Sequence, residues 1–130
     1  MFSLNINPTK SSPYVRFDPD ACDFVIQGES YPENAAAFYE PVLTRIGQWL
    51  KVSDRKELNV EFELRYYNSS TSKAIMNLLD LLQAASENGW DIDVSWRFHA
   101  ENEIIKESGE EFQEDYDLLD IRLIVIPMQG

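Results

Sequence analysis

The 130-residue chain has little cysteine, few basic residues and no long apolar run. With Cys22 as its one cysteine, it can form no internal disulfide and offers no thiol cluster to a metal. No apolar segment approaches the roughly 18 residues that span a bilayer, and residues 1–10 lack the pattern of a signal peptide. We therefore expect a reduced, cytoplasmic protein that holds no metal and no other cofactor.

The shortage of basic residues also bears on the choice of partner. The sequence has 23 acidic residues against 11 basic ones, a formal net charge of −12. A surface this negative repels phosphate backbones and anionic lipid, which argues against nucleic acid and membrane as partners. A protein partner with a basic docking face fits this charge.

The sequence contains enough apolar material for one folded domain. Hydrophobic residues make up 44% of the chain, and no repeat, low-complexity tract or linker divides it. We expect residues 1–130 to form a single domain with a core of its own. Its first part is β-like, with short strands at 4–6, 14–17 and 23–27, the last of them stopped by Gly28.

A helix is predicted after this β-like part. Apolar residues recur at three- and four-residue spacing, which places them on one helix face: Phe38, Val42, Ile46 and Trp49 or Leu50. The sequence Ser30-Tyr31-Pro32-Glu33 has the form of a capping box and predicts Ser30 as the N-cap. Pro41 cannot donate a helical hydrogen bond, so a kink or a break into two helices is expected there.

The remaining patterns predict an α/β fold with two layers. Residues 58–67 and 91–98 alternate strictly between apolar and polar, with an amphipathic helix at 75–85 between them. An acidic helix at 101–116 and a strand at 121–126 follow. This order implies crossover connections and a mostly parallel or mixed central sheet. Because the strands alternate, one face of the sheet should be wet and the helices should cover the other.

Crossover connections also predict where a functional site lies. Right-handed crossovers bring the helix N-termini to one edge of the sheet, beyond the carboxyl ends of the strands. The segments 28–34 and 67–73 should therefore be neighbours. The second of them, Asn68-Ser69-Ser70-Thr71-Ser72-Lys73, holds four hydroxyl residues in a row. One should cap the helix; a phosphorylation site, or an anion site of helix amides and Lys73, stays open beside that interpretation.

Other residues that carry chemistry have structural interpretations. His99 follows a predicted strand and has no nucleophile paired with it in sequence, and Cys22 fits a small core residue. The acidic run 101–120 lacks the glycine and the regular Asp spacing of a calcium loop, so it predicts a solvated helix face. Trp90 is a candidate for exposure.

Two stretches resemble the hallmarks of one protein family. Residues 66–74, Tyr-Tyr-Asn-Ser-Ser-Thr-Ser-Lys-Ala, are similar to the motif Tyr-x-Asn-Thr-Ser-Ser-x-Lys-Ala of the SiaC-like regulatory phosphoproteins. Residues 28–34, Gly-Glu-Ser-Tyr-Pro-Glu-Asn, match the second hallmark of that family. Weaker similarity continues through 75–82 and the acidic segment 109–115. The likeness follows nearly the whole chain in order, and its specific part is the two hallmarks.

This resemblance implies a fold like that of anti-sigma-factor antagonists (STAS-like domains) and a partner-switching role in signal transduction, not an enzymatic one. In such systems a dedicated Ser/Thr kinase phosphorylates the hydroxyl after the motif asparagine, and a metal-dependent Ser/Thr phosphatase removes the phosphate. The unmodified form binds a target enzyme. In the best-known branch this target is a diguanylate cyclase, which connects the switch to cyclic-di-GMP and biofilm formation.

By position in the motif, the phosphoacceptor is Ser69, with Ser70 and Thr71 as alternatives. The family usually carries Thr where this chain has Ser69 and an aliphatic residue where it has Ser72; serine retains the hydroxyl. The residues expected to contact partners belong to the two hallmarks: Tyr31, Pro32, Glu33, Asn34, Tyr67, Asn68, Ser69, Ser70 and Lys73. A phosphate at a helix N-terminus should leave the fold intact and act at the interface.

Two other functions stay open at this point. An anti-sigma-factor antagonist would use the same switch on a different target. A small hydrolase with paired carboxylates would need a positioned nucleophile or base, which the sequence does not supply. A binding protein is therefore the favoured class.

Overall fold

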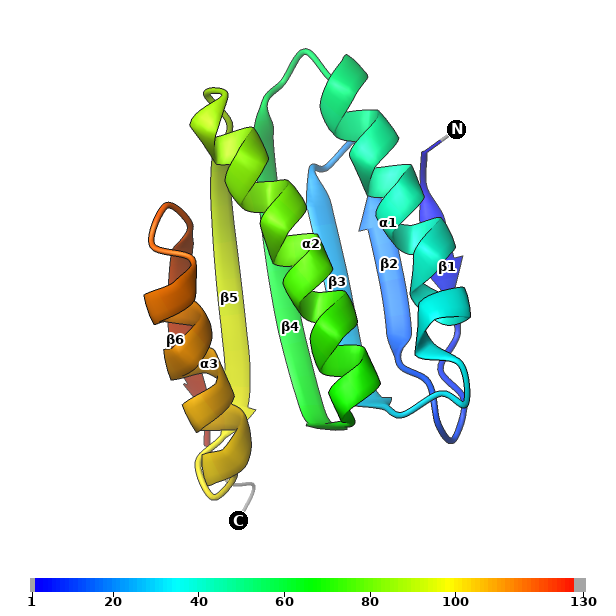
Figure 1. The fold of residues 1–130 in the computed structure, drawn as a ribbon, viewed down its shortest axis with the longest axis vertical. Helices are drawn as coiled ribbons and strands as arrows, with labels where there is room; N and C mark the ends of the chain where they lie inside the picture. The colour runs from blue at the N-terminus through cyan, green and yellow to red at the C-terminus, as the bar shows by residue number, and fades with distance from the viewer. Residues whose placement is uncertain (1, 128–130) are drawn as a thin grey trace.

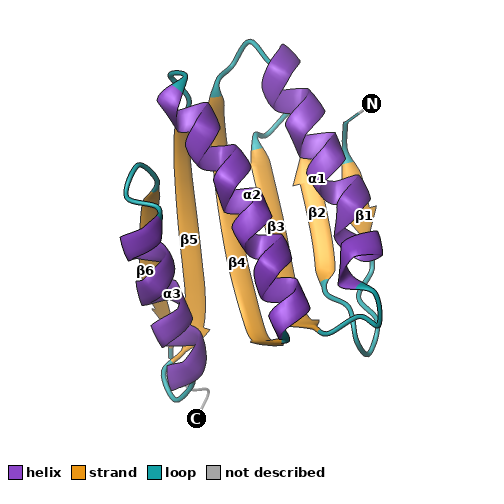
Figure 2. Cartoon of the chain, viewed as in Figure 1, coloured by secondary structure: helices purple, strands orange, loops and turns teal. Residues whose placement is uncertain are grey.

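The computed structural model describes residues 2–127, which form six strands and three helices in two layers (Figures 1 and 2). The strands are β1 (Leu4–Ile6), β2 (Tyr14–Asp18), β3 (Asp23–Ser30), β4 (Glu57–Tyr67), β5 (Asp91–His99) and β6 (Asp120–Ile126). The helices are α1 (Ala35–Val52), α2 (Ser69–Glu87) and α3 (Glu103–Asp115).

The sheet is mixed, and its strands lie in chain order from β1 to β6. The pairs β1–β2 and β2–β3 are antiparallel, whereas β3 to β6 are parallel. Each crossover adds the next strand on the same side, so crossovers of one hand place all three helices on one face of the sheet (Figure 1). This confirms the predicted two-layer α/β architecture, while the likeness to anti-sigma-factor antagonists stays a prediction.

The predicted alternation in the central strands is confirmed. Every second residue of β4 from Leu58 to Leu64 is buried under the helices. On the open face, Arg97 donates to Glu63 at 2.9 Å and lies 4.0 Å from Glu61, so the polar side chains there pair across strands. Trp90, a candidate for exposure, is instead buried with its ring centroid 5.1 Å from that of Trp49.

Two local predictions in the first half of the chain are wrong, and of the two outcomes expected at Pro41 the break does not occur. Gly28 does not end β3; with φ +112° it forms an irregularity in the pairing with β4, after which the strand continues to Ser30. Ser30 is therefore a strand residue and not the helix cap, which is Asn34. Pro41 does not divide the helix, because α1 loses one hydrogen bond there and its buried face, with Val42 and Ile46, holds it on the sheet.

The remaining sequence interpretations can be placed directly. Cys22 is buried in the core, as expected, and His99 is the half-buried last residue of β5. Within residues 2–127, no helix is long and apolar enough to cross a membrane, and no group of three or more His, Cys, Asp or Glu side chains is arranged to hold a metal ion.

Candidate functional site

All three helices begin at the edge of the sheet where the parallel strands end (Figure 1). Each is capped by an asparagine whose side-chain oxygen accepts from a backbone N–H three residues on. The distances are 3.1 Å from Asn34 to Ala37, 2.9 Å from Asn68 to Thr71 and 3.2 Å from Asn102 to Ile105. The expectation that a Ser or Thr caps α2 is therefore wrong, and the hydroxyl groups of residues 69–72 are left for other contacts.

The segments 28–34 and 67–73 are neighbours, as predicted. The register of β3 and β4 places Ser30 opposite Tyr67, and the backbone N–H of Asn68 donates to the Ser30 carbonyl at 3.1 Å. The rings of Tyr31 and Tyr66 meet edge to face with centroids 5.8 Å apart. The two family hallmarks thus form one continuous surface.

A buried network of three hydroxyl groups fixes this edge. The Ser30 hydroxyl lies 2.6 Å from that of Tyr39 and 2.9 Å from that of Thr71, and the Thr71 hydroxyl also donates to the Ser30 carbonyl at 3.0 Å. Burial raises the pKa of Tyr39, while the hydrogen bonds with Ser30 and Thr71 act in the opposite direction. The network connects β3, α1 and α2. Sequence analysis missed it because it placed Ser30 at a helix start.

The hydroxyl residues of α2 face in different directions. Ser69 and Ser70 are exposed, Ser72 is half-buried and Thr71 is completely buried. Since successive helix residues are rotated by about 100°, Ser69 and Ser70 face different neighbours. Ser70 lines the groove toward α1, and Ser69 lines the hollow toward α3.

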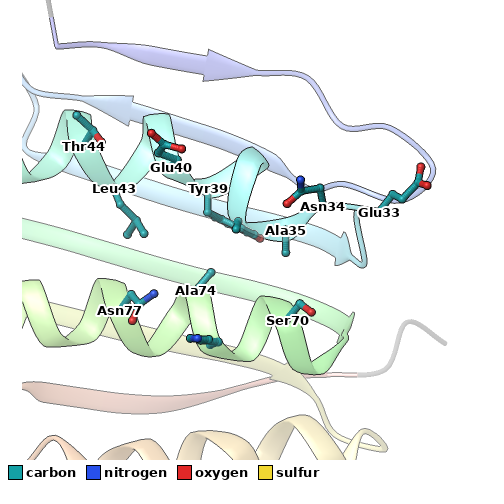
Figure 3. A pocket seen from close by; sticks show the side chains of 12 residues that line it. Glu33, Asn34, Ala35, Tyr39, Glu40, Leu43, Thr44, Ser70, Ala74 and Asn77 are labelled. Atoms are coloured by element: carbon teal, nitrogen blue, oxygen red, sulfur yellow. The ribbon is translucent and has the colours of Figure 1, made fainter.

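The groove between α1 and α2 has a volume of about 580 Å³. Figure 3 shows Ser70, Ala74 and Asn77 of α2 on the side that faces α1. Its lining also includes Glu33 and Asn34 from the first hallmark, together with Lys73 from the second. This groove therefore contains residues of both hallmarks.

The hollow between α2 and α3 is smaller, about 270 Å³. It is lined by residues from the end of β4 and from the first turns of both helices: Arg65, Tyr66, Tyr67, Asn68, Ser69, Ser72, Asn102, Ile104, Ile105 and Ser108. The Asn102 amide donates to the Arg65 carbonyl at 2.9 Å and so joins α3 to the end of β4. Sequence analysis missed the α3 contribution, although Ile104-Ile105, an apolar pair within the acidic run, was a visible signal.

The electrostatics of this edge differ from those of the molecule as a whole. Three helix N-termini direct their partial positive charges there, although the chain carries a net charge of −12. Lys73 is exposed one turn after Ser69, and Arg65 lies 4.0 Å from Glu29. Burial raises the pKa of Tyr67, so its phenol stays protonated at neutral pH. An added phosphate at this edge would meet helix amides and nearby cations.

The nine residues expected to contact partners all lie at this edge. Glu33, Asn34, Ser69, Ser70 and Lys73 are exposed. The other four are half-buried: Tyr31, Pro32, Tyr67 and Asn68. Asn68 is also the N-cap of α2. Their use by a partner stays a prediction.

Comparison with known proteins gives the family. The model of the SiaC family regulatory phosphoproteins matches residues 6–126, and the chain belongs to this family. An uncharacterized protein of Pseudomonas aeruginosa strain UCBPP-PA14 is 35% identical over 115 residues, covering 88% of this chain and 90% of its own.

Solved structures of SiaC from Pseudomonas aeruginosa share the fold. The apo form is 32% identical, with a TM-score of 0.82 over 96% of this chain and 98% of its own. A structure of the diguanylate cyclase SiaD in complex with its activator SiaC contains a chain that is 32% identical, with a TM-score of 0.85 over 96% of this chain and 99% of its own. The resemblance inferred from the two hallmarks is thus confirmed at the level of sequence family and fold.

Proposed function

We propose that this protein is a regulatory binding protein of a diguanylate cyclase, controlled by phosphorylation at the edge where the three helices begin. The observation that carries the proposal is the exposed Ser69 in the first turn of α2, inside the hallmark of a family of regulatory phosphoproteins. A member of that family has been crystallised as the activator in complex with its cyclase, which favours a cyclase target over an anti-sigma factor. The protein acts by binding and is not itself an enzyme.

Exposure ranks the three candidate acceptors. A kinase needs the hydroxyl group in an extended or accessible segment, and Ser69 and Ser70 both meet this condition. The Thr71 side chain is 0% exposed and bonded to Ser30, so its phosphorylation would require the start of α2 to open. Position in the motif then selects Ser69. We assign its modification to a Ser/Thr kinase and its release to a metal-dependent Ser/Thr phosphatase, in the cytoplasm.

The switch follows from where the added charge lies. A phosphate carries about −1.5 to −2 charges at neutral pH. At the start of α2 the helix amides and Lys73 stabilise it, so the fold tolerates it. An interface that covers Ser69 would have to strip this dianion of its water, which costs several kcal/mol and is offset only where a cation meets it in good geometry. Phosphorylation therefore releases the target without unfolding the protein. The partner surface includes the nine hallmark residues named above as expected partner contacts.

The test is intact-mass and fragment-ion spectrometry of the protein purified from its native cells, followed by treatment with its kinase and phosphatase. The proposal predicts one added phosphate, mapped to Ser69, that the phosphatase removes. The Ser69→Ala variant should stay unmodified in the same kinase reaction. A protein that carries no phosphate under any growth condition and resists the kinase would contradict the proposal.

A further inference from the structure

The first turn of α3 carries an apolar side chain that the fold leaves uncovered. Ile104 is 77% exposed, the largest exposed fraction among the large hydrophobic residues of 2–127. Its neighbour in sequence, Ile105, is buried and anchors the helix, and the Ile105 carbonyl accepts from the Trp96 indole at 2.8 Å. The backbone beside Ile104 is thus anchored in the core while the Ile104 side chain faces solvent.

Ile104 belongs to a small apolar surface and not to an isolated site. Tyr66, 52% exposed, lines the same hollow of about 270 Å³, and its ring contacts that of Tyr31. Ile104 also borders an adjoining shallow hollow with Arg65, His99 and Asn102. An aromatic and an aliphatic side chain around a shared hollow are the usual components of a protein-docking site.

The charge around this surface restricts the partner that fits it. Glu101 and Glu103 border Ile104 in the adjoining hollow, and Glu107 is exposed on the next turn of α3. Two basic residues lie nearby: Lys106 in α3, and Arg65, which lines both hollows and lies 4.0 Å from Glu29. At this rim, an apolar side chain flanked by Lys or Arg complements the carboxylates of Glu101 and Glu103.

We infer that the hollow between α2 and α3, with Ile104 and Tyr66 at its rim, receives an apolar anchor residue of the target, flanked by basic side chains. The inference rests on the proposed function and adds to it a contact at Ile104, which lies outside both hallmarks. Ser69 lines this hollow, while Ser70 lines the groove on the other side of α2. A phosphate on Ser69 places a hydrated dianion where the anchor residue binds, and this explains why the first hydroxyl of the series controls release.

The test compares two truncations by calorimetric titration against a diguanylate cyclase from the same organism. Ile104→Ala should weaken binding about tenfold or more, as expected for an anchor contact at the centre of an interface. Leu118→Ala is the matched control, because Leu118 is 55% exposed but lies after α3, away from the hollow; its affinity should equal that of the wild type. Circular dichroism confirms that both variants fold.

Two further comparisons test the position of the added negative charge on α2 and the role of the carboxylates beside Ile104. Ser69→Asp should weaken binding more than Ser70→Asp. The double variant Glu101→Gln/Glu103→Gln should slow association several-fold, whereas Glu110→Gln/Glu114→Gln, which removes the same charge farther along α3, should slow it less. Equal affinity of Ile104→Ala and wild type would overturn the inference and leave the proposed function standing. Absence of wild-type binding would overturn the proposed function and this inference with it.

Discussion

The Ser30 hydroxyl lies where β3, α1 and α2 meet, and its two hydrogen-bond partners are also buried. Ser30→Ala leaves the Tyr39 hydroxyl without that bond inside the core, so we expect the free energy of unfolding to fall by about 1–3 kcal/mol. Ser69→Ala removes the same group from an exposed position and should change it by less than about 0.5 kcal/mol. Urea denaturation measures both. Equal losses would contradict the stabilising role of the buried network.

Tyr116 provides a second test at the residue scale, through its pKa. Its hydroxyl donates to Asp80 at 2.9 Å and lies 3.2 Å from the Met76 carbonyl. Burial, and then the bond to the Asp80 carboxylate, raise the pKa of Tyr116 to about 12 from a usual value of 10.0. The unfolded chain loses this proton first, so the stabilisation is complete below about pH 10 and falls as the pH rises toward 12.

The variant Tyr116→Phe cannot lose that proton. We expect its stability to depend less on pH than that of the wild type between about pH 10 and 12, because one proton released on unfolding is missing. Near neutral pH it should be less stable, since the bond between α3 and α2 is lost. Thermal unfolding of both proteins across this range is the measurement, and parallel stability curves would disprove the assignment.

At the scale of the elements, the contact of α3 with the sheet depends on a glycine. A Cβ atom added at Gly109 would collide with the Trp96 indole and the Leu123 side chain. Gly109→Ala gains about 1 kcal/mol of helix propensity but overpacks the core, so we expect a net loss of about 1–2 kcal/mol. In α1, a Cβ added at Gly47 meets no atom within 4 Å, and Gly47→Ala should stabilise by about 0.5–1 kcal/mol. Opposite signs in thermal unfolding are the expected result; stabilisation by both variants would contradict the packing of α3.

The elements also show what the sequence was able to predict. Strict alternation in the two central strands was sufficient to place helices on one face, because it depends on side-chain period alone. The residues at which the helices begin were harder to predict from the sequence. Ser30-x-x-Glu33 has the pattern of a capping box, but the irregularity at Gly28 lets β3 continue through Ser30. Pairing with β4, which is distant in sequence, determines where β3 ends, and no local sequence pattern encodes that pairing.

The sequence predicted which segments form the candidate site, but not which way their side chains face. Both hallmarks lie at one edge, as crossover topology requires. Which hydroxyl is buried depends on the residue that begins α2, since a shift of one position rotates every side chain by about 100°. Asn68 as cap turns Thr71 inward and leaves Ser69 and Ser70 exposed. The contribution of α3 depends on tertiary packing, which the acidic sequence of that helix concealed.

In the molecule as a whole, the buried core and the proposed phosphorylation site occupy separate parts. The core lies between the sheet and the helices, whereas Ser69 is exposed in the first turn of α2. A phosphate on Ser69 would add charge to an edge where three helix N-termini favour an anion (Figure 1). We therefore expect the modification to change binding and to leave the melting temperature within a few degrees of that of the unmodified protein.

The most direct measurement is the affinity of the unmodified and the Ser69-phosphorylated protein for a diguanylate cyclase from the same organism, together with the melting temperature of each form. The account predicts a loss of affinity of about a hundredfold or more, equivalent to two steps of 1.4 kcal/mol, and little change in melting temperature. Equal affinities of the two forms, or a phosphorylated protein that melts far below the unmodified one, would contradict it.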